Sequence, residues 1–289
     1  LRKTSQVPTL AELGLRGMAL KIVEESIKVP HGIVLITGPT GSGKTTTLYS
    51  VLHVLNTPRV NIVTLEDPVE YQIDGVNQVQ INPKAGLSFA TGLRSFLRQD
   101  PNIIMVGEIR DNETADLAIQ ASLTGHLVFS TLHTNSSSGA LPRLLDMQAE
   151  PFLLASSMTC VVAQRVLRKI CDNCSEQYVP PAQALEEIKK VLGSLYESYV
   201  SQLGGKQVML TRGRKCEKCG DTGYKGRIAI FEVLKVTEKI GKLILERAPA
   251  IAIEQASVLD GMVLMEQDGY MKALEGVTTI EEVMRVAKT

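Results

Sequence analysis

Short apolar runs alternate, through the first half of the chain, with amphipathic segments whose apolar residues recur at helical spacing. Continuous apolar runs of this length are typical of parallel strands that are buried on both faces. We expect strands at 33–37, 60–65, 76–81, 103–108 and 127–132, and helices at 46–52, 89–97, 111–123 and 136–146. Because strands and helices alternate, the predicted fold class is α/β, with a mainly parallel sheet covered by helices.

The pattern changes after residue 150. Residues 152–170 are apolar and then basic, which predicts one long helix, and residues 10–29 predict a helix that connects into the core. We also expect a helix at about 182–202, a strand at 227–234 and three short helices after it. The chain thus divides into a linker and connecting helix from an upstream domain (1–30), an α/β core (31–150), a segment of helix and paired cysteines (151–234) and a helical C-terminal segment (235–289).

Composition limits the class of protein. The chain is 44% hydrophobic, enough for a buried core, and its 31 lysines and arginines balance 31 aspartates and glutamates, which argues against a protein that holds nucleic acid by a strong global field. No apolar run is long enough for a membrane span and no signal peptide is present. We therefore expect a cytoplasmic protein whose five cysteines are thiols or metal ligands. Because the chain starts at Leu1 on a polar segment, we expect it to be a fragment of a longer protein.

A glycine-rich turn lies between the predicted strand at 33–37 and the helix that follows it. The turn and the first residues of the helix are Gly38, Pro39, Thr40, Gly41, Ser42, Gly43, Lys44, Thr45 and Thr46. In a P-loop the glycines turn backbone N–H groups around a phosphate, and the N-terminus of the helix adds its positive dipole end. Lys44 would reach the β- and γ-phosphates and Thr45 would ligate Mg²⁺. The alternative is an ordinary glycine-rich turn, but the motif and both flanks predict a site for a nucleoside triphosphate.

Two carboxylates follow predicted strands, where open α/β sheets place their ligands. Glu66 ends one strand and Glu108 ends another, in a segment similar to a Walker B strand with Gly107 where aspartate is usual. Phosphoryl transfer needs charge neutralisation and an oriented water. We assign Glu108 mainly to Mg²⁺ and water and Glu66 mainly to polarising the attacking water, the alternative for each being a solvated or capping carboxylate.

Four cysteines form two Cys-x-x-Cys pairs, which offer four thiolates for a tetrahedral zinc ion. They are Cys171, Cys174, Cys216 and Cys219. The gap between the pairs is longer than in a usual zinc ribbon, so unrelated thiols or a redox pair are the alternative. Cys160 lies among apolar residues and is expected in the core.

The order of these motifs resembles that of the secretion ATPases. Their Walker A, Asp box, Walker B and His box motifs are similar to 38–45, 66–70, 106–111 and 124–135, and the arginine segment 94–100 lies between the second and third. The two cysteine pairs and the segment 223–227 narrow the resemblance to the type II secretion and type IV pilus assembly branch. Retraction ATPases of the same superfamily lack the four-cysteine element. The resemblance covers nearly the whole chain.

The resemblance implies a RecA-like P-loop core in a homo-hexameric ring, on the cytoplasmic side of the inner membrane, that couples ATP hydrolysis to assembly of a pseudopilus or pilus. The implied partners are inner-membrane platform proteins, and by resemblance we expect the segment that docks on them to lie outside this sequence. By resemblance His126 and His133 sense the γ-phosphate or link sites, with structural histidines as the alternative. Arg94 and Arg98 are candidate transition-state arginines, in cis or in trans, with a surface pair as the alternative.

Two other functions compete with this prediction. A nucleic-acid motor such as a helicase shares the P-loop core and ring assembly, but the balanced charge and 4% aromatic content provide no basic track or stacking platform. A nucleotide-gated scaffold would bind ATP without useful turnover, which the pair of Glu66 and Glu108 argues against.

Overall fold

The computed structural model describes residues 7–287 of the 289-residue chain, so the ends of the predicted linker and C-terminal segment, 1–6 and 288–289, lie outside the described residues. The strands are β1 (Gly32–Thr37), β2 (Ile62–Glu66), β3 (Asn77–Gln80), β4 (Ile103–Val106), β5 (Leu127–Leu132), β6 (Met158–Ile170), β7 (Ser175–Tyr178), β8 (Leu210–Gly213) and β9 (Tyr224–Lys235). The α-helices are α1 (Leu10–Leu13), α2 (Gly17–Ser26), α3 (Lys44–Leu55), α4 (Phe89–Phe96), α5 (Asn112–Leu123), α6 (Ala140–Asp146), α7 (Pro151–Ser157), α8 (Ala182–Leu192), α9 (Ser194–Gln202), α10 (Glu238–Leu245), α11 (Ala250–Leu259), α12 (Met265–Leu274) and α13 (Ile280–Ala287).

The main sheet has seven strands in the order β3-β2-β4-β5-β1-β6-β9. β1 pairs in parallel with β5 on one side and with β6 on the other, and β2 pairs in parallel with both β3 and β4. Every residue of β1, β2, β4 and β5 is buried, as expected of parallel strands covered on both faces. The predicted mainly parallel α/β fold is therefore confirmed.

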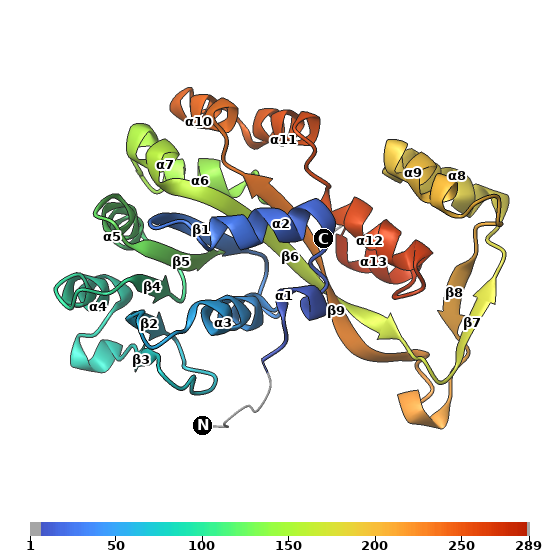
Figure 1. Ribbon diagram of the computed structural model, residues 1–289, viewed down its shortest axis with the longest axis horizontal. Helices are drawn as coiled ribbons and strands as arrows, with labels where there is room; N and C mark the ends of the chain where they lie inside the picture. The colour runs from blue at the N-terminus through green and yellow to red at the C-terminus, as the bar shows by residue number, and fades with distance from the viewer. Residues whose placement is uncertain (1–6, 288–289) are drawn as a thin grey trace. The chain divides into compact units, whose positions relative to one another are not determined.

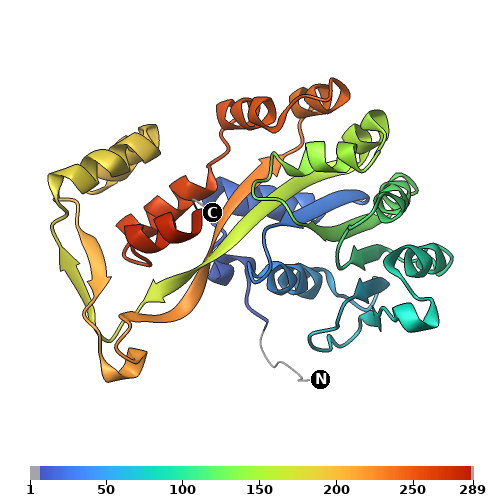
Figure 2. The ribbon, with the colours of Figure 1, turned by 180° about the vertical axis from the view of Figure 1, so that it is seen from behind.

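Helices connect the parallel strands and pack against them (Figure 1). α3 packs against β1, α4 against β2 and β4, and α5 against β1 and β5. The N-termini of two of these helices are capped by side chains: the Ser88 hydroxyl accepts from the N–H of Thr91, and the Asp111 carboxylate accepts from the N–H of Thr114. The helices α4 and α5 thus begin at residues whose side chains favour a helix N-terminus. The reverse view in Figure 2 shows the same arrangement.

The chain forms two compact units. The first comprises residues up to Gln164 together with Glu232–Met262, and the second comprises Arg165–Phe231 with the residues from Val263 onward. β6 and β9 each begin in one unit and end in the other. The second unit contains the antiparallel pair β7–β8, the helices α8, α9, α12 and α13 and four of the five cysteines. The four-segment division of the sequence stays a prediction of the domain organisation.

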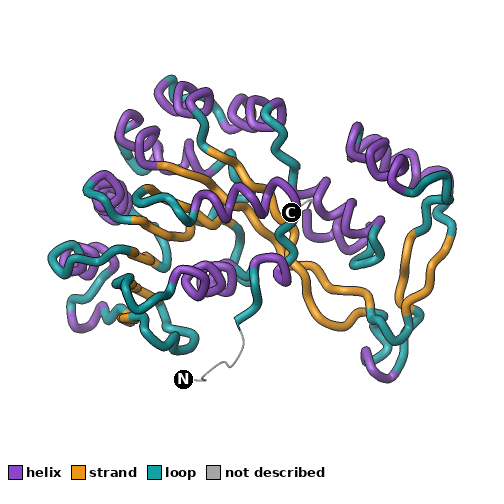
Figure 3. The backbone as a smooth tube through the Cα atoms, in the orientation of Figure 1, coloured by secondary structure: helices purple, strands orange, loops and turns teal. Residues whose placement is uncertain are grey.

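The predicted long helix at 152–170 is wrong. α7 ends at Ser157, and the chain continues as the thirteen-residue strand β6, coloured as strand in Figure 3. Most of β6 is buried, and its centre is rich in valine, including Val161 and Val162. A continuous apolar run is compatible with a buried helix or a buried strand. Here the run pairs with β1 and therefore forms a strand.

Other helix boundaries differ from the prediction. The helix expected at 10–29 is divided into α1 and α2, because Gly14 caps α1 with a left-handed backbone at φ 110°. The helix expected at 182–202 is divided at Gly193 into α8 and α9. The expected serine cap at 136 is also wrong, since α6 begins at Ala140 after an N-cap glycine. Four helices, and not three, follow β9 in the described part of the chain.

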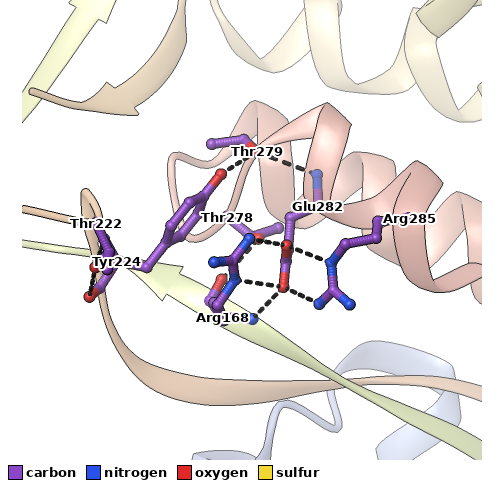
Figure 4. A network of polar contacts seen from close by, with 7 residues as sticks. All are labelled: Arg168, Thr222, Tyr224, Thr278, Thr279, Glu282 and Arg285. Atoms are coloured by element: carbon purple, nitrogen blue, oxygen red, sulfur yellow. Dashed lines mark hydrogen bonds and ion pairs between the residues drawn. The ribbon is translucent and has the colours of Figure 1, made fainter.

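A buried carboxylate between two arginines joins β6 to α13 within the second unit (Figure 4). The Glu282 side chain is 1% exposed and accepts hydrogen bonds from Nε and Nη2 of Arg168, at 3.0 and 2.7 Å, and from Nε and Nη2 of Arg285, at 3.0 and 2.6 Å. The Arg168 guanidinium also lies over the Tyr224 ring, 4.2 Å from its centroid. Burial raises the pKa of Glu282, but the arginines outweigh it and hold the pKa at about 2.

This network makes the stability of the second unit depend on pH. A carboxyl whose pKa is near 2 when folded and 4.5 when unfolded stabilises the fold above pH 4.5, and this contribution is lost as the pH falls towards 2. We expect Glu282→Gln to lower the free energy of unfolding at pH 7 by on the order of 3 kcal/mol and to flatten its dependence between pH 4.5 and 2.5. Denaturant unfolding at several pH values measures both. The exposed Glu281→Gln on the same helix is the control, and equal slopes in wild type and Glu282→Gln would contradict the assignment.

Candidate functional site

The C-terminal ends of β1, β2, β4 and β5 lie at one edge of the sheet, because these strands run parallel. We call this edge the P-loop edge, since the glycine-rich turn follows β1 there. Glu66 is the last residue of β2, Glu108 follows β4, and His133 follows β5. The structure therefore brings Lys44, Glu66, Glu108 and His133 to the edge where open α/β sheets bind ligands.

The glycine-rich turn has the backbone that a phosphate cradle requires. Gly38, Gly41 and Gly43 have φ values of 148°, 79° and 86°, which residues other than glycine rarely adopt. A Cβ atom at Gly38 would lie 2.6 Å from the carbonyl oxygen of Gln164. Lys44 Nζ donates to the carbonyl oxygens of Gly38 at 2.8 Å and Pro39 at 3.0 Å, so the lysine side chain folds back onto the start of the turn.

The opening of α3 completes this cradle. α3 begins at Lys44, and no side chain in the described part of the chain caps its N-terminus. The first N–H groups of such a helix have no intrahelical partner and attract an anion. Thr45 and Thr46 are exposed in this first turn, whereas Ser42 is buried. The residues present thus fit a bound polyphosphate and its magnesium ion.

Glu108 lies between a histidine and an arginine at the P-loop edge. Its carboxylate is 2.8 Å from His133 Nε2 and accepts a hydrogen bond from Arg110 Nε at 2.7 Å, with 15% of the side chain exposed. Arg110 also lies 3.8 Å from the Asp67 carboxylate. The carboxylate is therefore fixed in direction while part of its surface stays open to solvent, which suits a group that orients water or ligates a metal.

The close approach of two strands explains why this Walker B-like segment has Gly107 where aspartate is usual. Its N–H donates to the carbonyl oxygen of Leu65 at 2.7 Å, and a Cβ atom there would lie 3.0 Å from the same oxygen. The backbones of β2 and β4 approach too closely at this point to admit a side chain without displacement. Glu108 is consequently the first residue after β4 that can present a carboxylate.

Glu66 has a different environment, because it is buried with 3% exposure. Its carboxylate accepts hydrogen bonds from Thr64 Oγ1 at 2.7 Å, Gln78 Nε2 at 3.0 Å and the Tyr49 hydroxyl. Burial and the neighbouring Glu66 carboxylate raise the pKa of Tyr49 well above its usual range. Neither Tyr49 nor Gln78 was predicted from the sequence, although a tyrosine on the buried face of the P-loop helix is a detectable signal.

The two histidines lie at opposite edges of the sheet. β5 is six residues long and runs parallel to β1, so about 20 Å separate its ends. His133 follows β5 at the P-loop edge, whereas His126 precedes it and its Nδ1 lies 2.8 Å from the carbonyl oxygen of Ala121. The structure thus brings His133 to the candidate site and does not bring His126 there.

The two predicted arginines lie in α4 and just after it. Arg94 forms an ion pair with Glu113 on the exposed surface of α4 and α5, and Arg98 Nη1 donates to the carbonyl oxygen of Arg94 at 3.0 Å. The residues just after Arg98 contact Asn61, which precedes β2. Because β2 is five residues long, about 16 Å separate this region from the C-terminal end of the strand. Arg98 therefore does not reach the P-loop of its own chain in this conformation, whereas Arg94 is held by Glu113 in the first turn of α5.

The four paired cysteines converge on one point. All four Sγ atoms lie within 4.8 Å of one another, with 3.9 Å between Cys171 and Cys216, 3.9 Å between Cys174 and Cys219 and 3.7 Å between Cys216 and Cys219. Four thiolates around a tetrahedral zinc ion, at about 2.3 Å each, would be about 3.8 Å apart. The geometry of the donor atoms thus fits a metal ion.

Local turns and strand pairing build this cluster. The N–H of Cys174 bonds to the carbonyl of Cys171, and that of Cys219 to the carbonyl of Cys216. The antiparallel pairing of β7 with β8 closes the long segment 175–215 and brings the two pairs together, which accounts for the unusual spacing. Burial raises the pKa of the Cys219 thiol, but backbone N–H donors from Cys216 and Gly223 outweigh it and lower the pKa to about 6. Burial and the neighbouring cysteines raise the pKa of the Cys174 thiol to about 12, so a metal ion would have to displace that proton.

Glu232 is a buried polar residue near the site that was not predicted from the sequence. Its carboxylate accepts from the N–H of Ser137 at 2.9 Å and from the Ser137 hydroxyl at 2.6 Å. Ser137 belongs to the segment that follows His133, so Glu232 anchors one end of that segment to β9. A single carboxylate within the apolar run Ile230–Leu234 was the signal in the sequence.

A parallel sheet in which one strand leads through a glycine-rich turn into a helix, and in which a carboxylate follows another strand at the same edge, defines a P-loop nucleotide-binding protein. The family is more specific. A model of the family described as "Type II/IV secretion system protein" matches residues 1–285, and the chain belongs to that family.

Two curated relatives agree with this assignment. The type IV pilus assembly ATPase PilB of Thermus thermophilus is 46% identical over 284 residues, covering 98% of this chain and 31% of that protein. The type II secretion system protein E of Pseudomonas aeruginosa is 47% identical over 279 residues, covering 96% of this chain and 53% of that protein. The chain thus spans about a third to about half the length of these relatives.

Solved structures show the same fold. The pilus retraction motor PilT, solved with bound ADP, is 29% identical with a TM-score of 0.69, covering 98% of this chain and 67% of that chain. The ATPase DotB of Legionella pneumophila is 24% identical with a TM-score of 0.68, covering 96% of this chain and 64% of that chain.

None of the helices within residues 7–287 is both long and apolar enough to cross a lipid bilayer.

Proposed function

We propose that this chain binds and hydrolyses MgATP as the motor portion of an ATPase that assembles a pseudopilus or a type IV pilus. The observation that carries the proposal is the arrangement of Lys44, Glu108 and His133 at one edge of the sheet, around a glycine-rich turn that opens a helix. Membership of the secretion family, and relatives named as an assembly ATPase and as type II secretion proteins, support it.

The P-loop residues bind and neutralise the phosphates. The N–H groups of the turn and of the start of α3 donate to phosphate oxygens, and Lys44 Nζ exchanges its bonds to the Gly38 and Pro39 carbonyls for bonds to the β- and γ-phosphates. The Thr45 hydroxyl and the Glu108 carboxylate are the ligands proposed for Mg²⁺, which supplies further neutralisation when bound. Little covalent chemistry is required of the protein beyond this positioning.

The acidic residues orient the attacking water. The sequence assigned this role mainly to Glu66, but Glu66 is buried and already accepts three hydrogen bonds, so we propose Glu108 as the main partner of the water. The contact of His133 Nε2 with the Glu108 carboxylate at 2.8 Å holds that carboxylate in one direction. Glu66 is the second candidate, held by its three donors at the end of β2. Because His133 contacts Glu108, it is also in a position to sense a γ-phosphate through that carboxylate. For His126, only the role of linking one site to another remains as a prediction.

The four cysteines are proposed to hold one structural zinc ion. Four protein ligands with no open position are typical of structural sites, and such a site stabilises the fold that it closes. Here the ion would tie the ends of β6, β7, β8 and β9 together within the second unit.

The proposed assembly is a homo-hexameric ring on the cytoplasmic side of the inner membrane, with platform proteins of a secretion or pilus system as partners. The position of Arg98 away from its own P-loop favours action in trans, on the site of a neighbouring subunit. The family and relatives described above give no support to the nucleic-acid motor that was the alternative, and the balanced charge of the chain agrees with this.

Two substitutions separate nucleotide binding from hydrolysis. Lys44→Ala removes the positive contact to the phosphates, so affinity for MgATP and turnover should both fall at least tenfold. Glu108→Gln leaves the P-loop intact, so it should bind MgATP with nearly normal affinity while its turnover falls roughly a hundredfold. Equilibrium binding and steady-state phosphate release measure the two effects.

The control is Glu246→Gln, which removes an exposed carboxylate at the end of α10. It should match wild type in both assays. Normal ATP binding by Lys44→Ala would remove the basis of the P-loop assignment, and normal turnover by Glu108→Gln would transfer the water-activating role to Glu66.

Mixing inactive subunits tests the placement of Arg98. An arginine that stabilises transition-state charge in trans is worth roughly 10³ to 10⁵ in rate in known GTPases. If Arg98→Ala and Glu108→Gln are each inactive as pure rings, some interfaces in a mixed ring pair an intact Glu108 with an intact Arg98, and phosphate release should partly return. Mixed rings that demonstrably form without recovering activity would show that Arg98 does not act in trans. Arg94→Ala, mixed in the same way, tests the second candidate.

Metal analysis tests the cysteine cluster. Freshly purified protein should contain one zinc ion per chain, and Cys174→Ser should lose most of it and loosen the second unit, because a closed site forfeits folding free energy with any ligand. Cys160→Ala, which removes the cysteine outside the cluster, should keep its zinc. Far less than one equivalent in unchelated wild-type protein would contradict the assignment.

A further inference from the structure

Gln164 is a buried polar residue that contacts the P-loop from behind. It lies in β6 and is 1% exposed. Its Nε2 donates to the carbonyl oxygen of Ser42 at 2.6 Å, and its Oε1 accepts from Thr47 Oγ1 at 2.8 Å. The orientation of the amide follows from its partners, because a carbonyl oxygen only accepts and must face the NH₂ end.

The two contacts enclose the residues that the P-loop motif assigns to phosphate and magnesium. Ser42 and Thr47 flank the segment 43–46, which contains the left-handed Gly43, Lys44 and the exposed threonines of the first helical turn. Thr47 Oγ1 also lies 3.4 Å from the carbonyl oxygen of Gly43. Gln164 therefore fixes both ends of this short segment from a single side chain.

The backbone of β6 is equally close to the turn. Thr37 of β1 pairs with Ala163, so Gln164 lies beside Gly38, the first residue of the turn. A Cβ atom at Gly38 would meet the Gln164 carbonyl oxygen at 2.6 Å. Because Gly38 has no side chain, the backbone of β6 approaches the P-loop closely and supports it directly.

The contact with Ser42 determines the direction of a neighbouring N–H group. The Ser42–Gly43 peptide is trans, so its C=O and N–H point in opposite directions. Since the C=O faces the Gln164 amide, the N–H of Gly43 points away from that amide and from β6. In a P-loop this is the side on which backbone N–H groups meet the phosphate.

We infer that Gln164 is a positioning residue for nucleotide binding, which aims the Gly43 N–H at the phosphate by holding the opposite end of the same peptide. This inference rests on the proposed function of the P-loop as an ATP site. Gln164 touches no nucleotide, and it acts through Ser42, Gly43 and Thr47. Because the N–H contact exists both in bound substrate and in the transition state, its loss weakens affinity and leaves the maximal rate nearly unchanged.

Two substitutions at Gln164 provide the test. Gln164→Glu keeps the acceptor for Thr47 but places an oxygen against the Ser42 carbonyl, and Gln164→Met keeps the length and removes both bonds. With a fluorescent ADP analogue and Mg²⁺ as the probe, we expect the Kd to rise roughly tenfold in each. In preparations that hydrolyse ATP, KM should rise similarly while kcat stays within about twofold.

The controls distinguish this inference from the proposed function. Gln267→Glu removes a similar bond, from Gln267 Nε2 to the Val191 carbonyl in the second unit, and should leave the Kd for the ADP analogue unchanged. If wild type fails to bind the probe, or Lys44→Ala binds it normally, the proposed function fails. If wild type binds, Lys44→Ala does not, and a folded Gln164→Glu binds as wild type does, only the Gln164 inference is overturned.

A pair of substitutions at Thr47 decides the matter if neither Gln164 variant folds. Thr47→Val removes the hydroxyl that anchors Oε1, and Thr47→Ser retains it. We expect about a threefold higher Kd for the valine variant and a normal Kd for the serine variant. Equal affinity of these two variants would overturn the inference.

Discussion

The parallel pairing of β1 with β5 and β6 is the constraint on which the candidate site depends. It places the turn after β1 at the same edge as the residues that follow β4 and β5, and it sets β6 directly beneath that turn. The absence of a side chain at Gly38 permits this close approach. A helix in place of β6 would remove both the neighbour of β1 and the support of the P-loop.

Two carboxylates at this edge have opposite environments. Glu108 is partly exposed and lies between the ionisable Arg110 and His133, whereas Glu66 is buried and accepts from the neutral donors Thr64, Gln78 and Tyr49. A carboxylate with an open side can meet water or a metal without a change in structure. A buried one that is fully bonded mainly fixes the elements that surround it. The geometry therefore favours Glu108 over Glu66 as the first partner of the attacking water.

One polar residue on β6 and one on β9 support the P-loop edge within the first unit. Gln164 and Glu232 are the residues of these strands at which the first unit ends and resumes, and each bonds to a segment of that edge. In the second unit the same strands lead to the cysteine cluster and to the network around Glu282. Gln164 and Glu232 each place one buried polar group beside a segment of the first unit, and the hydrogen bonds of that group hold the backbone there in one arrangement.

The amino-acid sequence by itself identified the P-loop, the parallel α/β core and four cysteines that are candidate metal ligands. These features depend on local patterns: a glycine-rich turn between a strand and a helix, short buried runs, and paired thiols. Tertiary structure decided what local patterns leave open. Residues 158–170 became a strand because β1 pairs with the first part of that run and β9 lies on its other side, and this also turned Gln164 towards the P-loop. Likewise, strand direction separated His133 from His126, and pairing of β7 with β8 closed the long gap between the cysteine pairs. Contacts between residues far apart in the chain have no signature in periodicity or spacing.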